Sequence, residues 1–248
     1  MSRNIKRNVK LEISYDGTNY HGFQTQPDRP TVQAELAKVL FELTGGNVRL
    51  AASGRTDAGV HARKQVVHFK LDEAIPIEKL PTVFNRLLPA DIRVTAASEV
   101  GKEFHSRYDA VMKTYRYYIY NARISDVFMR QYSWHVPFAI DVVAMQQAAQ
   151  YFKGTHDFTS FSTLYGKDDR VRTITHSEIW REGDRVIFEI RGSGFLHNMV
   201  RIMIGTLVRV GDGTFLPEEI GIIIEKQDRR EAGPTAPASG LFLWDVEY

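Results

Sequence analysis

The sequence contains no cysteine, which excludes a disulfide, a thiolate nucleophile and a zinc site built from cysteines. It also has no apolar run near the roughly eighteen residues that a membrane span needs, and residues 1–10 (MSRNIKRNVK) are too polar for a secretory signal. An HExxH pair, a GxxxxGK[ST] phosphate loop and a GxSxG nucleophile motif are missing as well. We therefore expect a cytoplasmic protein with no membrane segment and no metal site.

A strong charge of one sign is also missing, because 32 Lys and Arg residues face 30 Asp and Glu residues and the net charge is +2. The chain thus lacks the basic excess of many nucleic-acid-binding domains, and any phosphate-binding surface must be local. Its candidate residues are Arg3, Lys6, Arg7 and Lys10, then Arg107, Lys113, Arg116 and Arg123, and finally Arg170, Arg172, Arg229 and Arg230. Each group is equally compatible with an ordinary solvated surface.

The composition that is present, 43% hydrophobic and 25% charged over 248 residues, is that of a globular protein with one large domain or two smaller ones. In the first part, alternation predicts strands at 10–15, 48–52, 65–71 and 92–97. Two helices are predicted, one capped by Thr31 and stopped by Gly45, the other near 81–88. Residues 20–24 are expected to extend the pairing of the first strand. The resulting order is β-α-β-β-α-β.

The second part repeats this order with one helix added. Its predicted strands are 113–120, 172–181, 185–191 and 241–246, and its predicted helices follow Asp141, span 196–210 and follow Pro217. Two such units are the split ferredoxin-like motif written twice. We therefore expect an α+β fold with halves at 1–105 and 106–248. The halves would join into one extended, mostly antiparallel sheet with helices mainly on one face and an active-site cleft between them.

The most informative stretch is GRTDAGVHA, residues 54–62, between two predicted strands. Gly54 and Gly59 allow backbone angles and a close ligand approach that other residues resist. The one acid, Asp57, is surrounded by little side-chain bulk. One interpretation is an Asx-type turn in a tight loop, and the other is an accessible carboxylate that performs chemistry.

In LHNMVRIMIGTLV, residues 196–208 of the helix predicted at 196–210, Arg201 is the only charge and lies among apolar residues. Such a helix is expected to be buried, and a buried guanidinium is costly unless a carboxylate pairs with it. Asp57 is the best candidate partner, and the pair would keep Asp57 ionised as a nucleophile or base. The alternative is a structural ion pair, or a long side chain that reaches solvent.

The strand KTYRYYIY, residues 113–120, places Tyr115, Tyr117 and Ile119 on one face. A row of tyrosines can stack on a nucleobase. Tyrosines also pack well in ordinary strands, so this pattern alone favours a base-binding platform only weakly.

Several motifs together resemble the TruA-type tRNA pseudouridine synthases. They are GRTDAGVHA at 54–62, KTYRYYIYN at 113–121, HDFTSF at 156–161, SGFLHNMVRIMIGTL at 193–207 and AGPTAPASGL at 232–241. These motifs span nearly the whole chain, and their order and number make accidental agreement improbable.

The resemblance implies a cofactor-independent isomerase that acts on uridines 38, 39 and 40 of the tRNA anticodon stem-loop. It also implies two ferredoxin-like halves and a homodimer that contacts tRNA through both subunits. By the same resemblance, Asp57 matches the family nucleophile, Tyr115 the tyrosine against the target uracil, and Arg201 the basic partner of the aspartate. Arg55 matches the arginine associated with flipping the target nucleotide.

Two other functions are compatible with the residues taken alone. One is a noncatalytic RNA-binding module that uses the tyrosine strand as its platform, although this function leaves Arg201 unexplained and the RNP1 pattern of an RRM is missing. The other is a small-molecule enzyme with Asp57 as general base. Salt-dependent binding of a tRNA transcript would argue against the latter, because phosphate contacts release counterions.

Overall fold

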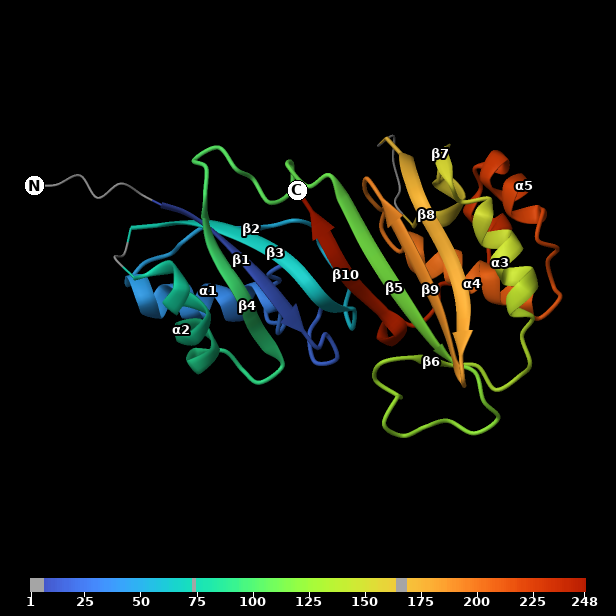
Figure 1. The fold of residues 1–248 in the computed structure, drawn as a ribbon, viewed down its shortest axis with the longest axis horizontal. Coiled ribbons are helices and arrows are strands. Elements are labelled where there is room, and N and C mark those ends of the chain that lie inside the picture. Colours follow the sequence, from blue (N-terminus) through green and yellow to red (C-terminus); the bar gives the residue numbers. More distant parts are fainter. Residues whose placement is uncertain (1–6, 73–74, 164–168) are drawn as a thin grey trace, which may run out of the picture. The chain divides into compact units, whose positions relative to one another are not determined.

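The computed structural model describes residues 7–72, 75–163 and 169–248, so that Arg3 and Lys6 of the first basic group lie outside it (Figure 1). The α+β class is confirmed, and the ten strands among these residues are mostly antiparallel. The chain divides into two compact units. Unit 1 comprises Met1–Val111 and Leu243–Tyr248, and unit 2 comprises Met112–Phe242.

Unit 1 has the predicted β-α-β-β-α-β order. Its elements are β1 (Arg7–Tyr15), α1 (Val32–Thr44), β2 (Leu50–Ala52), β3 (His61–Leu71), α2 (Leu80–Leu87) and β4 (Ile92–Val100). The hydrogen-bonded order is β4-β1-β3, with β2 also paired to β3, and every one of these pairs is antiparallel. This is the arrangement of a split ferredoxin-like motif. Strand β10 (Leu241–Glu247), which enters unit 1 at Leu243, follows β3.

The local signals for α1 act as predicted. The Thr31 hydroxyl accepts a hydrogen bond from the Ala34 N–H at 3.4 Å, and the helix ends at Gly45, whose φ of 67° suits a residue without a Cβ. The apolar stripe of α1 lies in the same core as alternate residues of β1, all of them fully or almost fully buried. These are Val32, Leu36, Val39 and Leu40 from α1, and Val9, Leu11 and Ile13 from β1.

The prediction for residues 20–24 is wrong, because this segment forms no strand. Gly22 has a φ of 89°, and the backbone here hydrogen-bonds to the loop that carries Asp57 and not to β1. An isolated bridge between Gln26 and Arg29 is the only β-type pairing between β1 and α1, a stretch the structure describes in full.

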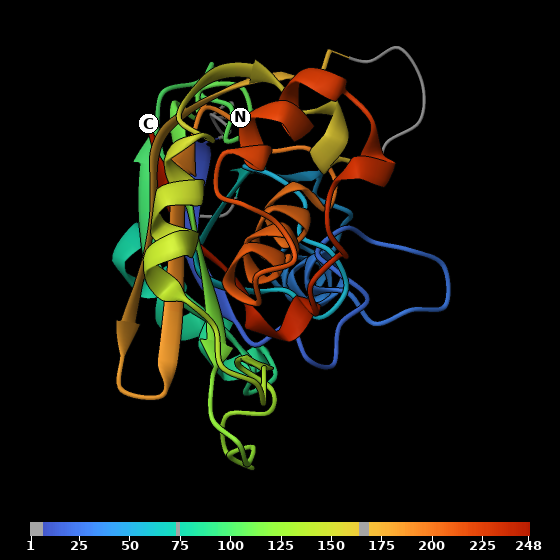
Figure 2. The same cartoon turned by 90° about the vertical axis from the view of Figure 1, so that its right-hand side faces the viewer.

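Unit 2 contains two short strands that were not predicted, β6 and β7, besides the predicted elements. Its elements are β5 (Met112–Tyr120), β6 (Trp134–His135), α3 (Val142–Gln150), β7 (Gly154–Asp157), β8 (Val171–Glu182), β9 (Arg185–Gly192), α4 (Met199–Gly211) and α5 (Glu219–Lys226). The order is β5-β9-β8-β7, and β6 pairs in parallel with β5. Figure 2 shows α4 and α5 on one side of β8 and β9. Strands of two and four residues are too short to give a period-2 signal.

Helix α4 is buried nearly all round, as its apolar sequence predicts; Ile202, Met203 and Ile204 are fully inaccessible. It begins at Met199, three residues later than predicted, because Asn198 adopts a left-handed conformation with a φ of 60°. Asn tolerates that conformation better than most residues. Short 3-10 helices lie at Ile77–Lys79, Thr159–Phe161, Arg229–Glu231 and Ala238–Gly240.

Candidate active site

The loop that joins β2 to β3, Ser53–Val60, is called the Asp57 loop below. It closes with a turn in which the Val60 N–H donates to the Asp57 carbonyl at 3.1 Å. Gly59 occupies the third position of this turn with a φ of 77°, which explains the glycine. Asp57 is half-buried and Arg55 is exposed. The structure thus places two of the four predicted site residues together in one tight loop.

Two buried side chains fix the first half of this loop. Gln65 of β3 is fully buried, accepts from the Ser53 hydroxyl at 2.5 Å and donates to the Gly54 carbonyl at 3.1 Å. Tyr15 of β1 shares a 2.8 Å hydrogen bond with the Thr56 hydroxyl, and burial raises the pKa of Tyr15 to about 12. Neither Gln65 nor Tyr15 was predicted, although a glutamine within an apolar strand pattern is a signal that could have drawn attention.

The segment after β1 supports the second half of the loop. The Gly59 N–H donates to the Tyr20 carbonyl at 3.2 Å, and the Phe23 N–H donates to the Thr56 carbonyl at 3.1 Å. Contact is so close that a Cβ on Gly22 would lie 2.7 Å from the Thr56 oxygen. The Asp57 loop is therefore held from two directions, which is the preorganisation that a catalytic group requires.

His61, the first residue of β3, has a structural role here. Its buried ring accepts from the Gly17 N–H through Nδ1 at 3.0 Å, and Nδ1 lies 3.1 Å from the Asp16 carboxylate. These contacts anchor the segment that holds the loop.

The other two predicted residues belong to unit 2. Tyr115 of β5 is only 9% exposed, and its ring packs almost perpendicularly on that of Phe195, with centroids 5.0 Å apart. Phe195 precedes α4 and was not predicted as a site residue. Its contact restricts the Tyr115 ring to one edge-to-face geometry.

Arg201 lies on the first turns of α4 and is half-buried. Its Nε donates to the Ala236 carbonyl at 2.8 Å and its Nη1 donates to the Asn198 side-chain oxygen at 2.9 Å. The Ala236 N–H in turn donates to the Arg201 carbonyl at 3.0 Å. These neutral acceptors orient the guanidinium without cancelling its charge. That charge opposes the rise that burial causes in the pKa of the neighbouring Tyr117.

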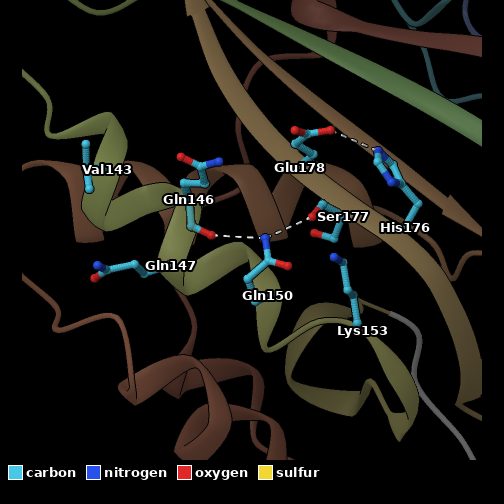
Figure 3. A pocket seen from close by; sticks show the side chains of 8 residues that line it. All are labelled: Val143, Gln146, Gln147, Gln150, Lys153, His176, Ser177 and Glu178. Atoms are coloured by element: carbon cyan, nitrogen blue, oxygen red, sulfur yellow. Dashed lines mark hydrogen bonds and ion pairs between the residues drawn. The ribbon is translucent and has the colours of Figure 1, made fainter.

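A pocket of about 540 Å³ lies in unit 2 beside α3 and β8 (Figure 3). It is lined by Val143, Gln146, Gln147, Gln150, Lys153, His176, Ser177 and Glu178. None of the four predicted site residues lines it. The pocket is therefore separate from the site that the motifs predict.

Within residues 7–72, 75–163 and 169–248, no group of three or more His, Asp or Glu side chains could hold a metal ion. In the same part of the chain, no helix has the length and apolar character needed to cross a membrane.

Comparison with known proteins identifies the chain. A family model described as tRNA pseudouridine synthase matches residues 13–109 and 148–248, ranges that include Arg55, Asp57 and Arg201. The class of protein is thus an RNA-modifying enzyme, an isomerase. The chain belongs to the tRNA pseudouridine synthase family.

Three relatives named tRNA pseudouridine synthase A support this assignment over almost the full length. The relative from Halalkalibacterium halodurans is 48% identical over 95% of this chain and 90% of its own. That from Brevibacillus brevis is 48% identical over 98% and 100%, and that from Moorella thermoacetica is 48% identical over 97% and 99%. A solved structure of an H/ACA RNP bound to a substrate RNA is similar only at a TM-score of 0.36, with 15% identity over 81% of this chain and 53% of that chain.

Proposed function

We propose that this tRNA pseudouridine synthase isomerises uridines 38, 39 and 40 of the anticodon stem-loop, with Asp57 as the nucleophile and the target nucleotide flipped out of its stack. The observation that carries the proposal is the Asp57 loop itself. A half-buried carboxylate is presented on a turn that Gln65, Tyr15 and the Tyr20–Phe23 backbone hold in place. The family assignment supplies the reaction that such a carboxylate serves.

The reaction breaks the bond between C1′ and N1 of the uridine, turns the uracil while it is held, and joins C1′ to C5, from which a proton is lost. The freed N1 takes up a proton in its place, so product and substrate are isomers and the reaction balances without a cofactor. Three routes are open to Asp57: attack on C1′, addition to the uracil ring, or removal of a C2′ proton to give a glycal. Each requires an ionised carboxylate beside the sugar and base.

Arg201 is proposed as the cation that pairs with the Asp57 carboxylate. A half-buried guanidinium on the first turn of a mostly buried helix, oriented by Asn198 and Ala236, supports this role. An arginine can bind a carboxylate through two parallel hydrogen bonds.

Tyr115 and Arg55 are proposed to bind the target nucleotide. The restricted ring of Tyr115 suits stacking on the detached uracil, which must stay near C1′ until the new bond forms. Arg55 is exposed and lies two residues from Asp57, so its guanidinium can fill the space that the flipped nucleotide leaves. Extrusion of a nucleotide costs a few kcal/mol, which such filling offsets in part.

The proposed partners are the tRNA anticodon stem-loop and a second copy of the chain, in a homodimer. Because the proposed substrate is tRNA, we also propose that the enzyme works in the cytoplasm. Basic residues in local groups can hold phosphates in spite of the small net charge of +2.

The decisive experiment measures tritium release from C5-labelled uridine in an unmodified tRNA transcript. Wild-type protein is expected to release tritium, and Asp57→Asn is expected to bind the transcript but release none. Asp28→Asn is the matched control, since Asp28 is an exposed acid of the same unit outside the loop and its φ of 54° suits asparagine. Sequencing of the product then tests positions 38, 39 and 40.

Two outcomes would overturn the proposal. Appreciable isomerisation by Asp57→Asn would remove Asp57 from its role. If neither protein released tritium while both bound the transcript tightly, the chain would act as an RNA-binding module.

A further inference from the structure

A series of five rings lies in unit 1 and leads to an exposed tyrosine. The rings belong to Tyr248, Phe104, His68, His105 and Tyr108, and neighbouring centroids are 5.0, 5.9, 4.7 and 4.3 Å apart. Tyr108 ends the series with 76% of its surface exposed, although its ring lies only 34° from the plane of His105. One face of the Tyr108 ring is therefore backed by the His105 ring, while Tyr108 remains open to solvent.

This tyrosine lies on residues 101–109, which are called the 101–109 turn. Hydrogen bonds from other segments hold the turn in place. The side chain of Asn8, 1% exposed, donates to the carbonyls of Gly101 and Phe104 at 2.9 and 3.0 Å. The fully buried Ser106 donates to the Ala51 carbonyl at 3.0 Å, and its own carbonyl accepts from the Tyr248 hydroxyl at 2.7 Å. Four hydrogen bonds to β1, β2 and Tyr248 thus hold the turn.

His68 also helps to hold the 101–109 turn. Burial, together with the nearby His105 and Lys70, lowers the pKa of His68 to about 4, so the ring is neutral at physiological pH. A neutral ring can accept the Ser106 N–H at Nδ1, a contact of 3.2 Å. The tyrosine at the tip is accordingly presented on a rigid support and needs little ordering when a partner binds.

The 101–109 turn and its surroundings carry cationic side chains, which can contact the phosphates of a nucleic acid. The Arg107 guanidinium lies 6.0 Å from the Tyr108 ring centroid, and Lys70 and Lys102 are exposed nearby, where the Lys70 amine donates to the Lys102 carbonyl. Of the acids on the turn, Asp109 accepts from the His105 N–H at 2.9 Å, and Glu103 is exposed. A cation beside an open aromatic face is the arrangement that holds an unstacked base and its phosphate.

We propose that Tyr108, backed by His105 and flanked by Arg107, is a stacking platform for an unpaired base of the RNA substrate outside the reacting nucleotide. This inference rests on the proposed function, since it takes tRNA as the ligand. Stacking accepts any base, because every base has a π face, so the platform adds affinity and does not select a sequence.

The test compares Tyr108→Ala with wild type on one unmodified tRNA transcript, by fluorescence anisotropy for Kd and by tritium release for kcat and KM. Loss of one stacked base predicts a Kd and KM raised about tenfold, with kcat at saturating tRNA unchanged. Tyr108→Trp should bind as wild type does because it keeps a planar ring. Tyr151→Ala is the matched control, because Tyr151 is a surface tyrosine that is 44% exposed just after α3.

Salt dependence separates stacking from charge. Tyr108→Ala should leave the slope of log Kd against log salt unchanged, whereas Arg107→Gln should reduce it by about one phosphate contact. A Tyr108→Ala variant that binds like wild type, while wild type turns over the tRNA, would overturn the platform alone. Wild type that binds without turnover would refute the proposed function, and its Kd against that of Tyr108→Ala would still test the platform.

Discussion

Gln65 offers the sharpest test of how the Asp57 loop is held. The fully buried side chain accepts from the Ser53 hydroxyl at 2.5 Å and from the Val66 N–H at 3.1 Å, and it donates to the Gly54 carbonyl at 3.1 Å. Gln65→Leu keeps a similar volume and removes both the acceptor and the donor. The hydroxyl of Ser53, a fully buried residue, and the Gly54 carbonyl then lose their hydrogen bonds to Gln65.

Each buried polar group that loses its hydrogen bond costs about 1–3 kcal/mol, so the two together predict a loss of about 2–6 kcal/mol of unfolding free energy. For a chain of this length the corresponding decrease in Tm is roughly 4–24 °C. The rate of tritium release should decrease as well, because the first half of the Asp57 loop is no longer fixed.

Calorimetry and the tritium assay measure the two effects side by side. Gln147→Leu, an exposed glutamine on α3, serves as the control and should change neither Tm nor rate. Ser53→Ala should cost less in the Gln65→Leu background than in wild type, because the two side chains share one hydrogen bond. A Gln65→Leu variant that unfolds within about 1 °C of wild type would refute the claim that this side chain supports the loop.

The remaining predictions concern three other residues. Arg201→Leu should lower turnover by roughly a hundredfold, with Arg201→Lys only partly active because lysine lacks the planar fork; full activity of both would remove the proposed pairing with Asp57. Gly17→Ala should destabilise the protein by about 1–3 kcal/mol in a thermal unfolding experiment, because the added Cβ would overlap the Val60 carbonyl. Gly46→Ala should leave the Tm unchanged in the same experiment, because a Cβ there meets no atom within 4 Å. His68 is neutral in the folded state and has a lowered pKa of about 4, so stability should fall as pH drops from about 6.5 towards 4 and stay level above 6.5; urea midpoints at pH 7.5 and 5 should differ less in His68→Gln than in wild type.

Much of the fold follows from local sequence signals. Thr31 and Gly45 mark the two ends of α1, Asp141 caps α3 through the Val143 and Ala144 N–H groups, and the apolar run after Asn198 forms the buried helix α4. Each of these signals acts within a few residues, so the sequence contains the whole interaction. The short strands β6 and β7 depend instead on partners far along the chain, and no local pattern marks them.

The same division applies to the candidate site. Glycines around one acid, and one arginine within the apolar stretch 196–208, were enough to single out Asp57 and Arg201, because both patterns are unusual within a single short stretch. The sequence could not indicate that Gln65 and Tyr15 hold the Asp57 loop, since these contacts join residues that are 11 and 41 positions apart. It also misassigned residues 20–24, which form two backbone hydrogen bonds with that loop and none that makes a strand.

By itself, then, the sequence determined the α+β class, the helix boundaries set by caps and the family to which the chain belongs, because these depend on periodicity and motifs. The tertiary structure alone decided how rigidly Asp57 is presented and that Tyr108 stands exposed at the end of a ring series. The physical reason is that a side chain's exposure and hydrogen-bond partners depend on packing between distant segments, and no short stretch of sequence contains that information.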